Sequence, residues 1–96
     1  MATKKGYNKR FKIGESAIGG IIQVDIHGKI ILISALDWFT KKIVTSGSHL
    51  TNQINSPYTI FNFLCELTST YHANKILDWI KSKVKLGNEF DVDTLL

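Results

Sequence analysis

Hydrophobic and polar residues alternate along the stretch 19–45, whose sequence is GGIIQVDIHGKIILISALDWFTKKIVT. Because successive side chains of a β-strand point to opposite faces of a sheet, this period of two predicts strands. The pair His27-Gly28 suits a two-residue hairpin loop, which places Val24 opposite Ile31. The stretch therefore predicts three antiparallel strands.

The two faces of these strands differ in polarity. One face is aliphatic, so the rest of the chain has to cover it. The other face is mixed. It consists of Ile21, Gln23, Asp25, Ile30, Leu32, Ser34, Leu36 and Trp38. Residues 29–37 are apolar on both faces, which predicts a central strand that is covered on one face and partly covered on the other.

A further strand precedes this stretch, and the stretch itself ends in another. Residues 10–15 alternate in the same way, and residues 42–50 follow the central strand after a loop that carries two aromatic rings. If that loop has four residues, Leu36 pairs with Ile43 and the residue before Leu36 pairs with Val44. The sequence thus predicts four strands in a meander.

Apolar residues recur with helical spacing in the segment 56–86. Ser56 suits an N-cap and Pro57 the first helical position, while Gly87 suits a C-terminal stop. The run 68–70, Thr-Ser-Thr, has low helix propensity, so we expect two helices rather than one. The first apolar stripe is Ile60, Phe61, Leu64, Leu67 and Tyr71, and the second is Ile76, Leu77, Ile80 and Val84.

Together these elements predict an α+β fold, in which an antiparallel sheet over residues 9–50 carries the helical segment on its aliphatic face. A chain of 96 residues can bury one hydrophobic core and not two, so we expect a single domain. We interpret residues 1–8 as a flexible basic arm and residues 87–96 as an acidic tail.

Composition and targeting signals narrow the class of protein. With 44% hydrophobic and 21% charged residues, the chain has the composition of a folded globular domain. Its apolar runs are far shorter than the roughly 20 residues that a membrane helix needs, and no apolar segment follows the basic N-terminus as in a secretory signal. We therefore expect an intracellular protein, cytoplasmic or nucleoid-associated, with no membrane partner.

No constellation of residues indicates catalysis. Cys65 is the single cysteine and lies in an apolar helical context, so we interpret it as a core residue rather than a catalytic thiol. The three histidines lack partners at metal-ligand spacing, and the sequence contains no nucleophile elbow, Walker loop or dinucleotide-binding loop. We expect a protein that is not an enzyme and that needs neither metal nor cofactor.

The distribution of charge favours an anionic partner. The formal net charge is +4, and the basic residues of the first dozen positions have no acidic residue among them. Proteins that bind single strands combine cations for the phosphates with aromatic rings for the bases. The candidate nucleic-acid-binding residues are Lys9, Arg10, Lys12, Lys29, Lys41 and Lys42 for the phosphates, and Trp38 and Phe39 for stacking, with Tyr7 and Phe11 as further rings.

Trp38 and Phe39 occupy turn positions, where small polar residues are usual. Either these rings cap an open end of the core, or they are displayed for a partner. Aromatic rings beside lysines also occur on protein-binding sheets, where they act as anchors. The sequence leaves these interpretations open.

Four features follow one another in the first half of the chain: the run Phe11-Lys12-Ile13-Gly14, the turn Gly28-Lys29, an apolar strand and Trp38. In this order they resemble the start of the positive-cofactor-four type of single-stranded DNA-binding domain, whose order of elements is similar to that of Whirly-type proteins. The resemblance covers about residues 11–44. It implies a curved sheet that binds single strands as a dimer, with Lys12, Lys29 and Trp38 near the nucleic acid. The chain departs from that pattern in a longer segment between Phe11 and Gly28 and in a second helical segment.

Two hypotheses of function follow. The leading one is a small non-enzymatic nucleic-acid-binding or DNA-associated regulatory protein, which binds single strands through basic and aromatic residues. The alternative is a protein-interaction module or adaptor that dimerises or binds a partner protein through the mixed sheet face. A four-stranded sheet leaves exposed edges, so we expect a homo-oligomer, with a dimer favoured, under either hypothesis.

Overall fold

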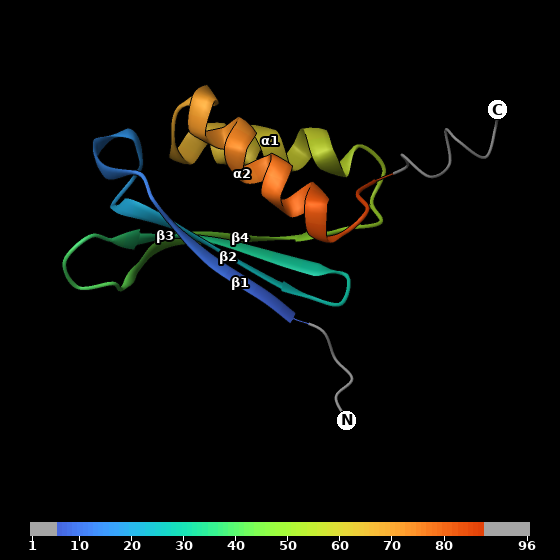
Figure 1. Cartoon of the computed structure of the whole chain (residues 1–96), viewed down its shortest axis with the longest axis horizontal. Coiled ribbons are helices and arrows are strands. Elements are labelled where there is room, and N and C mark those ends of the chain that lie inside the picture. The colour runs from blue at the N-terminus through green and yellow to red at the C-terminus, as the bar shows by residue number, and fades with distance from the viewer. Residues whose placement is uncertain (1–5, 88–96) are drawn as a thin grey trace, which may run out of the picture.

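The computed structural model describes residues 6–87 (Figure 1). Four strands form one antiparallel sheet, in which the spatial order follows the order along the chain, and two helices come after it. The predicted α+β fold is therefore confirmed. The elements are β1 (Gly6–Lys12), β2 (Gly20–His27), β3 (Ile30–Asp37), β4 (Ile43–Leu50), α1 (Ser56–Leu67) and α2 (Thr70–Lys83). The first five residues of the predicted arm and the acidic residues of the predicted tail lie outside the described residues.

Both helices lie on one side of the sheet, and within residues 6–87 no element covers the other side (Figure 1). The hydrophobic core fills the space between the helices and the aliphatic face, as predicted. Burial of each large aliphatic side chain contributes about 1.5–3 kcal/mol to folding. The main core residues are Ile22, Val24, Ile26, Ile31, Ile33 and Ala35 from the sheet, and Ile60, Leu64, Leu67, Ala73, Ile76, Leu77 and Ile80 from the helices.

The β2–β3 hairpin turns one residue later than predicted, with residues 28 and 29 in the loop. Gly28 has a φ of +59°, and a positive φ at the first loop position favours glycine. The predicted pairing of Val24 with Ile31 is therefore wrong, because Val24 lies opposite Ile33. Since each partner moves by two residues, every side chain still points to its predicted face.

β1 begins earlier than predicted. Residues 6–8 were expected to belong to a flexible arm but are part of the strand, and β1 ends at Lys12. The chain then turns into a short 3₁₀ helix, η1 (Gly14–Ser16), which ends the strand before its predicted boundary. Tyr7 and Phe11 are both half-buried against the core, so they anchor this edge strand to the rest of the molecule.

β4 pairs with β3 in the predicted register at one end only. Leu36 lies opposite Ile43, as predicted, but Ala35 pairs with Thr45, so the predicted pairing of Ala35 with Val44 is wrong. Val44 is the extra residue of a β-bulge, a feature that alternating hydrophobicity does not reveal. At this bulge Ile43 and Val44 are both exposed, by 60% and 53%.

The helical segment breaks at Thr68, and the prediction of two helices is confirmed. Ser69 is the N-cap of α2, where its Oγ accepts a hydrogen bond from the backbone N–H of His72 at 3.3 Å. The backbone N–H of Ile18 donates to the carbonyl of Leu67 at 2.8 Å, which ties this break to the β1–β2 connection. No helix within residues 6–87 has the length and apolar character needed to cross a membrane.

The helix ends differ from the predicted ones. Asn55, with a φ of +65°, is the N-cap of α1, while Ser56 is the first helical residue and its buried hydroxyl donates to the carbonyl of Thr51 at 3.2 Å. α2 ends at Lys83, before the predicted stop at Gly87. The N–H of Gly87 donates to the same Thr51 carbonyl at 2.6 Å, so this glycine anchors the chain after α2 to the start of α1.

One residue of the first predicted apolar stripe does not lie on α1 with the others. Tyr71 lies in the first turn of α2 and is 64% exposed, because the helix break separates it from the other four residues. Phe61 is half-buried against the core, and so is Cys65. In the second stripe Val84 follows the end of α2 and is half-buried.

Candidate nucleic-acid interface

The sheet face opposite the helices, called here the open face, carries a polar network along β1 and β2. The Nε of Arg10 donates to Gln23 Oε1 at 2.7 Å, and Gln23 Nε2 donates to Asp25 Oδ2 at 2.9 Å. Asn8 Nδ2 donates to the other oxygen of Asp25. The network holds the Arg10 side chain through one nitrogen, so within residues 6–87 its two terminal nitrogens remain available to an anionic partner.

An apolar cross-strand row lies at the end of the open face nearest the β3–β4 loop. Ile21 and Leu36 are opposite each other, with Lys12 beside Ile21 on β1 and Ile43 beside Leu36 on β4. Although no element of residues 6–87 covers this face, Ile21 and Leu36 are only 1% and 2% exposed. Lys12 and Ile43 flank this pair in the row, and the long apolar stem of a lysine suits a position beside buried aliphatic side chains.

The β3–β4 loop is held by Asp37. Its carboxylate accepts the backbone N–H of Thr40 at 2.9 Å and that of Phe39 at 3.0 Å. These hydrogen bonds, first that from Thr40, hold the pKa of Asp37 below its ordinary value. Lys41 adopts a positive φ of 64°, and its ammonium group donates to the carbonyl of Trp38. The loop therefore has a defined shape, and Lys41 is partly engaged within it.

The two rings of the β3–β4 loop differ, because one interpretation applies to Trp38 and the other to Phe39. Phe39 is 86% exposed and is displayed, whereas Trp38 is 41% exposed and leans on the backbone at Gly20. A Cβ at Gly20 would lie 3.1 Å from the Trp38 Cβ, so glycine permits this close approach. Trp38 thus partly caps the end of the sheet, and Phe39 does not.

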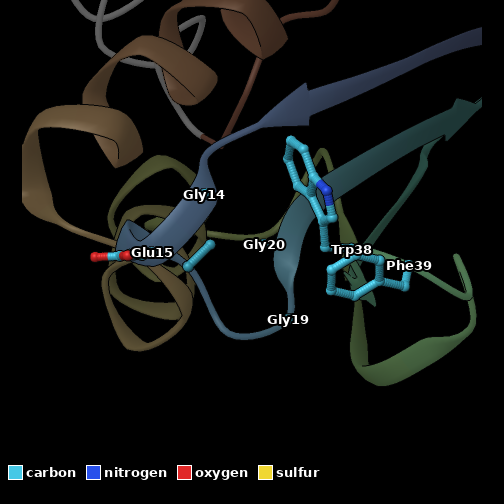
Figure 2. Close-up of a pocket in the computed structure, with 7 residues that line it drawn as sticks. Gly14, Glu15, Gly19, Gly20, Trp38 and Phe39 are labelled. Atoms are coloured by element: carbon cyan, nitrogen blue, oxygen red, sulfur yellow. The ribbon is translucent and has the colours of Figure 1, made fainter.

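A recess of about 500 Å³ lies between these rings and the β1–β2 connection. It is lined by Gly14, Glu15, Ala17, Gly19, Gly20, Trp38 and Phe39. Figure 2 shows Trp38 and Phe39 on one side and Glu15 on the other, with its carboxylate directed away from Trp38. The lining near the rings is therefore backbone and aromatic carbon, which suits a flat apolar group better than a charged one.

The structure brings together six of the eight predicted site residues and separates two. Lys12, Trp38, Phe39, Lys41 and Lys42 lie at the same end of the sheet, and Arg10 lies midway along β1. Lys29 lies in the β2–β3 loop at the opposite end of the eight-residue strand β3, about 25 Å away at 3.3 Å per residue. Lys9 belongs to the helix side of β1, with its ammonium group 5.4 Å from the centroid of the Phe11 ring.

A second group of rings and lysines, which the sequence pattern did not predict, lies where α2 meets β1. Trp79 contacts Phe11 edge to face, with ring centroids 5.9 Å apart. The ammonium group of Lys83 lies 5.4 Å from the ring centroid of Tyr7 and 5.7 Å from that of Trp79. The spacing of four residues between Trp79 and Lys83 is the signal in the sequence, but their proximity to β1 depends on the tertiary fold.

The remaining polar groups form no metal-ligand cluster within residues 6–87. No group of three or more His, Cys, Asp and Glu side chains there is placed to hold a metal ion. His49 packs on the ring of Phe63 at 5.1 Å between centroids, and its Nδ1 is buried without a hydrogen-bond partner. Burial lowers the pKa of His49, so the ring is held neutral.

Comparisons with models of protein families, with curated proteins and with solved structures find no match to this chain. The resemblance to single-stranded DNA-binding domains stays a prediction.

Proposed function

We propose that this protein binds single-stranded nucleic acid on the open face, without catalysing a reaction. The observation that carries the proposal is that Lys12, on a face that no element of residues 6–87 covers, lies at the same end of the sheet as the loop rings of Trp38 and Phe39, with Arg10 further along that face. Such proteins need cations that follow the phosphates and rings on which bases stack.

The two kinds of residue have separate roles in this proposal. Arg10, Lys12 and Lys42 contact phosphates, and Trp38 and Phe39 stack on bases. Phe39 contributes the most new contact, because 86% of its surface is open to solvent before binding. Stacking requires bases whose faces are accessible, so we expect single strands to bind more tightly than duplexes of the same length.

Substitution of Phe39 tests the stacking role. Loss of one stacked ring costs about 1–3 kcal/mol of binding, so Phe39→Ala should weaken affinity for a single strand by about 5- to 150-fold. Tyr58→Ala is the matched control, since Tyr58 is also largely exposed, at 69%, but lies on α1. Equal affinities for the two variants and the wild-type protein would argue against stacking on the loop.

A second candidate function is supported by the edge of the sheet formed by β4. This strand contains no charged residue and exposes Ile43 and Val44 beside its bulge, whereas edge strands usually carry charges that prevent pairing. We propose that a partner protein or a second copy of the chain adds to this edge. Sedimentation velocity should then show a dimer for the wild-type protein and a monomer for Val44→Lys. A wild-type monomer at high protein concentration would remove the self-association form of this proposal.

A further inference from the structure

Aromatic and lysine residues alternate along one ridge of α2. Tyr71, Lys75, Trp79 and Lys83 are four residues apart, so they lie one above another on the helix surface. The ammonium group of Lys75 is 4.9 Å from the ring centroid of Tyr71, and that of Lys83 is 5.7 Å from that of Trp79. Both pairs have the geometry of cation–π contacts.

β1 extends this ridge on its helix side. Lys83 also lies over the Tyr7 ring, and Trp79 meets Phe11 edge to face. The ammonium group of Lys9 lies over the Phe11 ring, 5.4 Å from its centroid. We call this surface the aromatic–lysine ridge. It consists of Tyr7, Lys9, Phe11, Tyr71, Lys75, Trp79 and Lys83.

Packing accounts for only part of the aromatic–lysine ridge. Phe11 and Trp79 are half-buried and join β1 to α2, but Tyr71 is 64% exposed and contributes little to the core. Within residues 6–87, the ammonium groups of Lys9, Lys75 and Lys83 form no ion pair. A cation above a ring keeps most of its surface open to an anion, and the ring limits its motion, which reduces the entropy lost on binding.

The aromatic–lysine ridge and the open face meet at the outer edge of β1. Arg10 and Lys12 project on the open side of this strand and Lys9 on the helix side, because successive residues of a strand alternate. A strand of nucleic acid leaving the open face therefore has to cross only β1 to reach the next cations. Lys9, Arg10 and Lys12 are all basic, and no acidic residue occurs in β1.

We infer that the single strand held on the open face continues over the outer edge of β1 onto the aromatic–lysine ridge. Lys9, Lys75 and Lys83 contact its phosphates, and the exposed ring of Tyr71 stacks on a base. This inference rests on the function proposed above and extends its binding site from one face of the sheet to two sides of β1.

The salt dependence of binding tests the inference with a matched pair of substitutions. Lys81 and Lys83 both lie in the last turn of α2, but residues two apart face different directions, so Lys81 is off the ridge. Each phosphate contact contributes about 0.7 to the slope of log affinity against log salt for a single strand. For an oligonucleotide of roughly 20 nucleotides, which exceeds the usual site sizes, Lys83→Ala should reduce the slope by about 0.7 and Lys81→Ala should leave it unchanged.

Two further measurements separate a binding role from a structural one. Lys83→Arg keeps the charge and the cation–π contact, so it should keep the wild-type slope. An oligonucleotide of roughly five nucleotides, near the lower end of site sizes, occupies the open face alone, so its slope should not respond to Lys83→Ala. Thermal melts of each variant confirm that it is folded.

The possible failures are distinguishable. If Lys83→Ala and Lys81→Ala have equal slopes while Arg10→Ala and Lys12→Ala reduce the slope, the ridge does not bind and the open face still does. A loss of slope in Lys83→Arg equal to that in Lys83→Ala would show that the effect does not come from charge and would also overturn the inference. If the wild-type protein binds no single strand at low salt, both proposals fail.

Discussion

Gly47 in β4 lies directly beneath a ring of α1, and we expect Gly47→Ala to destabilise the fold. A Cβ at this position would lie 2.8 Å from Phe63 Cζ, a separation that Cβ atoms essentially never show in folded proteins, and 3.1 Å from Cε1. The ring also packs against His49, with centroids 5.1 Å apart, so movement away from β4 disturbs a second contact. The added methyl therefore has no room unless α1 or the ring shifts.

The size of the effect follows from two opposing contributions. Overpacking costs about 1–3 kcal/mol, and the reduced entropy of the unfolded chain on replacing glycine returns about 0.4–1 kcal/mol. Because the Phe63 ring is only half-buried and can yield, we expect a net loss of about 1 kcal/mol. In urea unfolding this corresponds to a midpoint lowered by about 0.3–1 M.

A control and a rescue make this prediction specific. Ser48→Ala in the same strand changes an exposed position, so it should alter stability by less than about 0.5 kcal/mol. In the double variant Gly47→Ala/Phe63→Leu the ring is absent, and its loss of stability should be smaller than the sum of the two single losses. A Gly47→Ala protein as stable as the wild type would refute the close approach of α1 to β4.

Two predictions concern pH. Burial lowers the pKa of His49 in the folded protein below its ordinary value of 6.5. As the pH falls, the imidazole of the unfolded chain is therefore protonated before that of the folded protein. The free energy of unfolding should decrease as the pH drops through 6.5 and level off below the folded-state pKa. Urea midpoints at pH 7.5 and 5.5 measure this, and His49→Gln should remove most of the difference; an unchanged difference would assign it to another group. The pKa of Asp37 is also lowered, chiefly by the hydrogen bond from the Thr40 N–H. The ionised carboxylate therefore stabilises the fold at pH values above 3.8, the ordinary pKa of this group, and this stabilisation is lost as the pH falls through the folded-state pKa. Acid titration followed by circular dichroism should therefore show a shallower acid transition for Asp37→Asn, and an identical transition would contradict the role of the carboxylate in the loop.

The hydrophobic pattern predicted the faces of the strands better than their register. Alternation decides which way Val24 points, but a shift of its partner by two residues leaves every face unchanged, so the pattern cannot distinguish Ile31 from Ile33. The bulge at Val44 was hidden for a similar reason, since one extra residue at an edge changes no core position. The break at Thr68, in contrast, was visible because low helix propensity acts locally.

The candidate site was predictable in composition and not in arrangement. The loop rings and the lysines beside them are adjacent in sequence, so Trp38, Phe39 and Lys42 could be grouped before the fold was known. The separation of Lys29 from that group depends on which end of the sheet each loop occupies. The contact of Trp79 with Phe11 joins residues far apart in the chain, and only the packing of α2 over β1 brings them together.

The measurement that most directly tests the central claim is the fluorescence anisotropy of a labelled single-stranded oligonucleotide titrated with the purified protein, with a duplex of equal length as comparison. We expect saturable binding of the single strand that weakens steeply as salt rises, weaker binding of the duplex, and quenching of tryptophan emission as Trp38 stacks. Anisotropy that stays flat at low salt up to high protein concentration would contradict nucleic-acid binding on the open face.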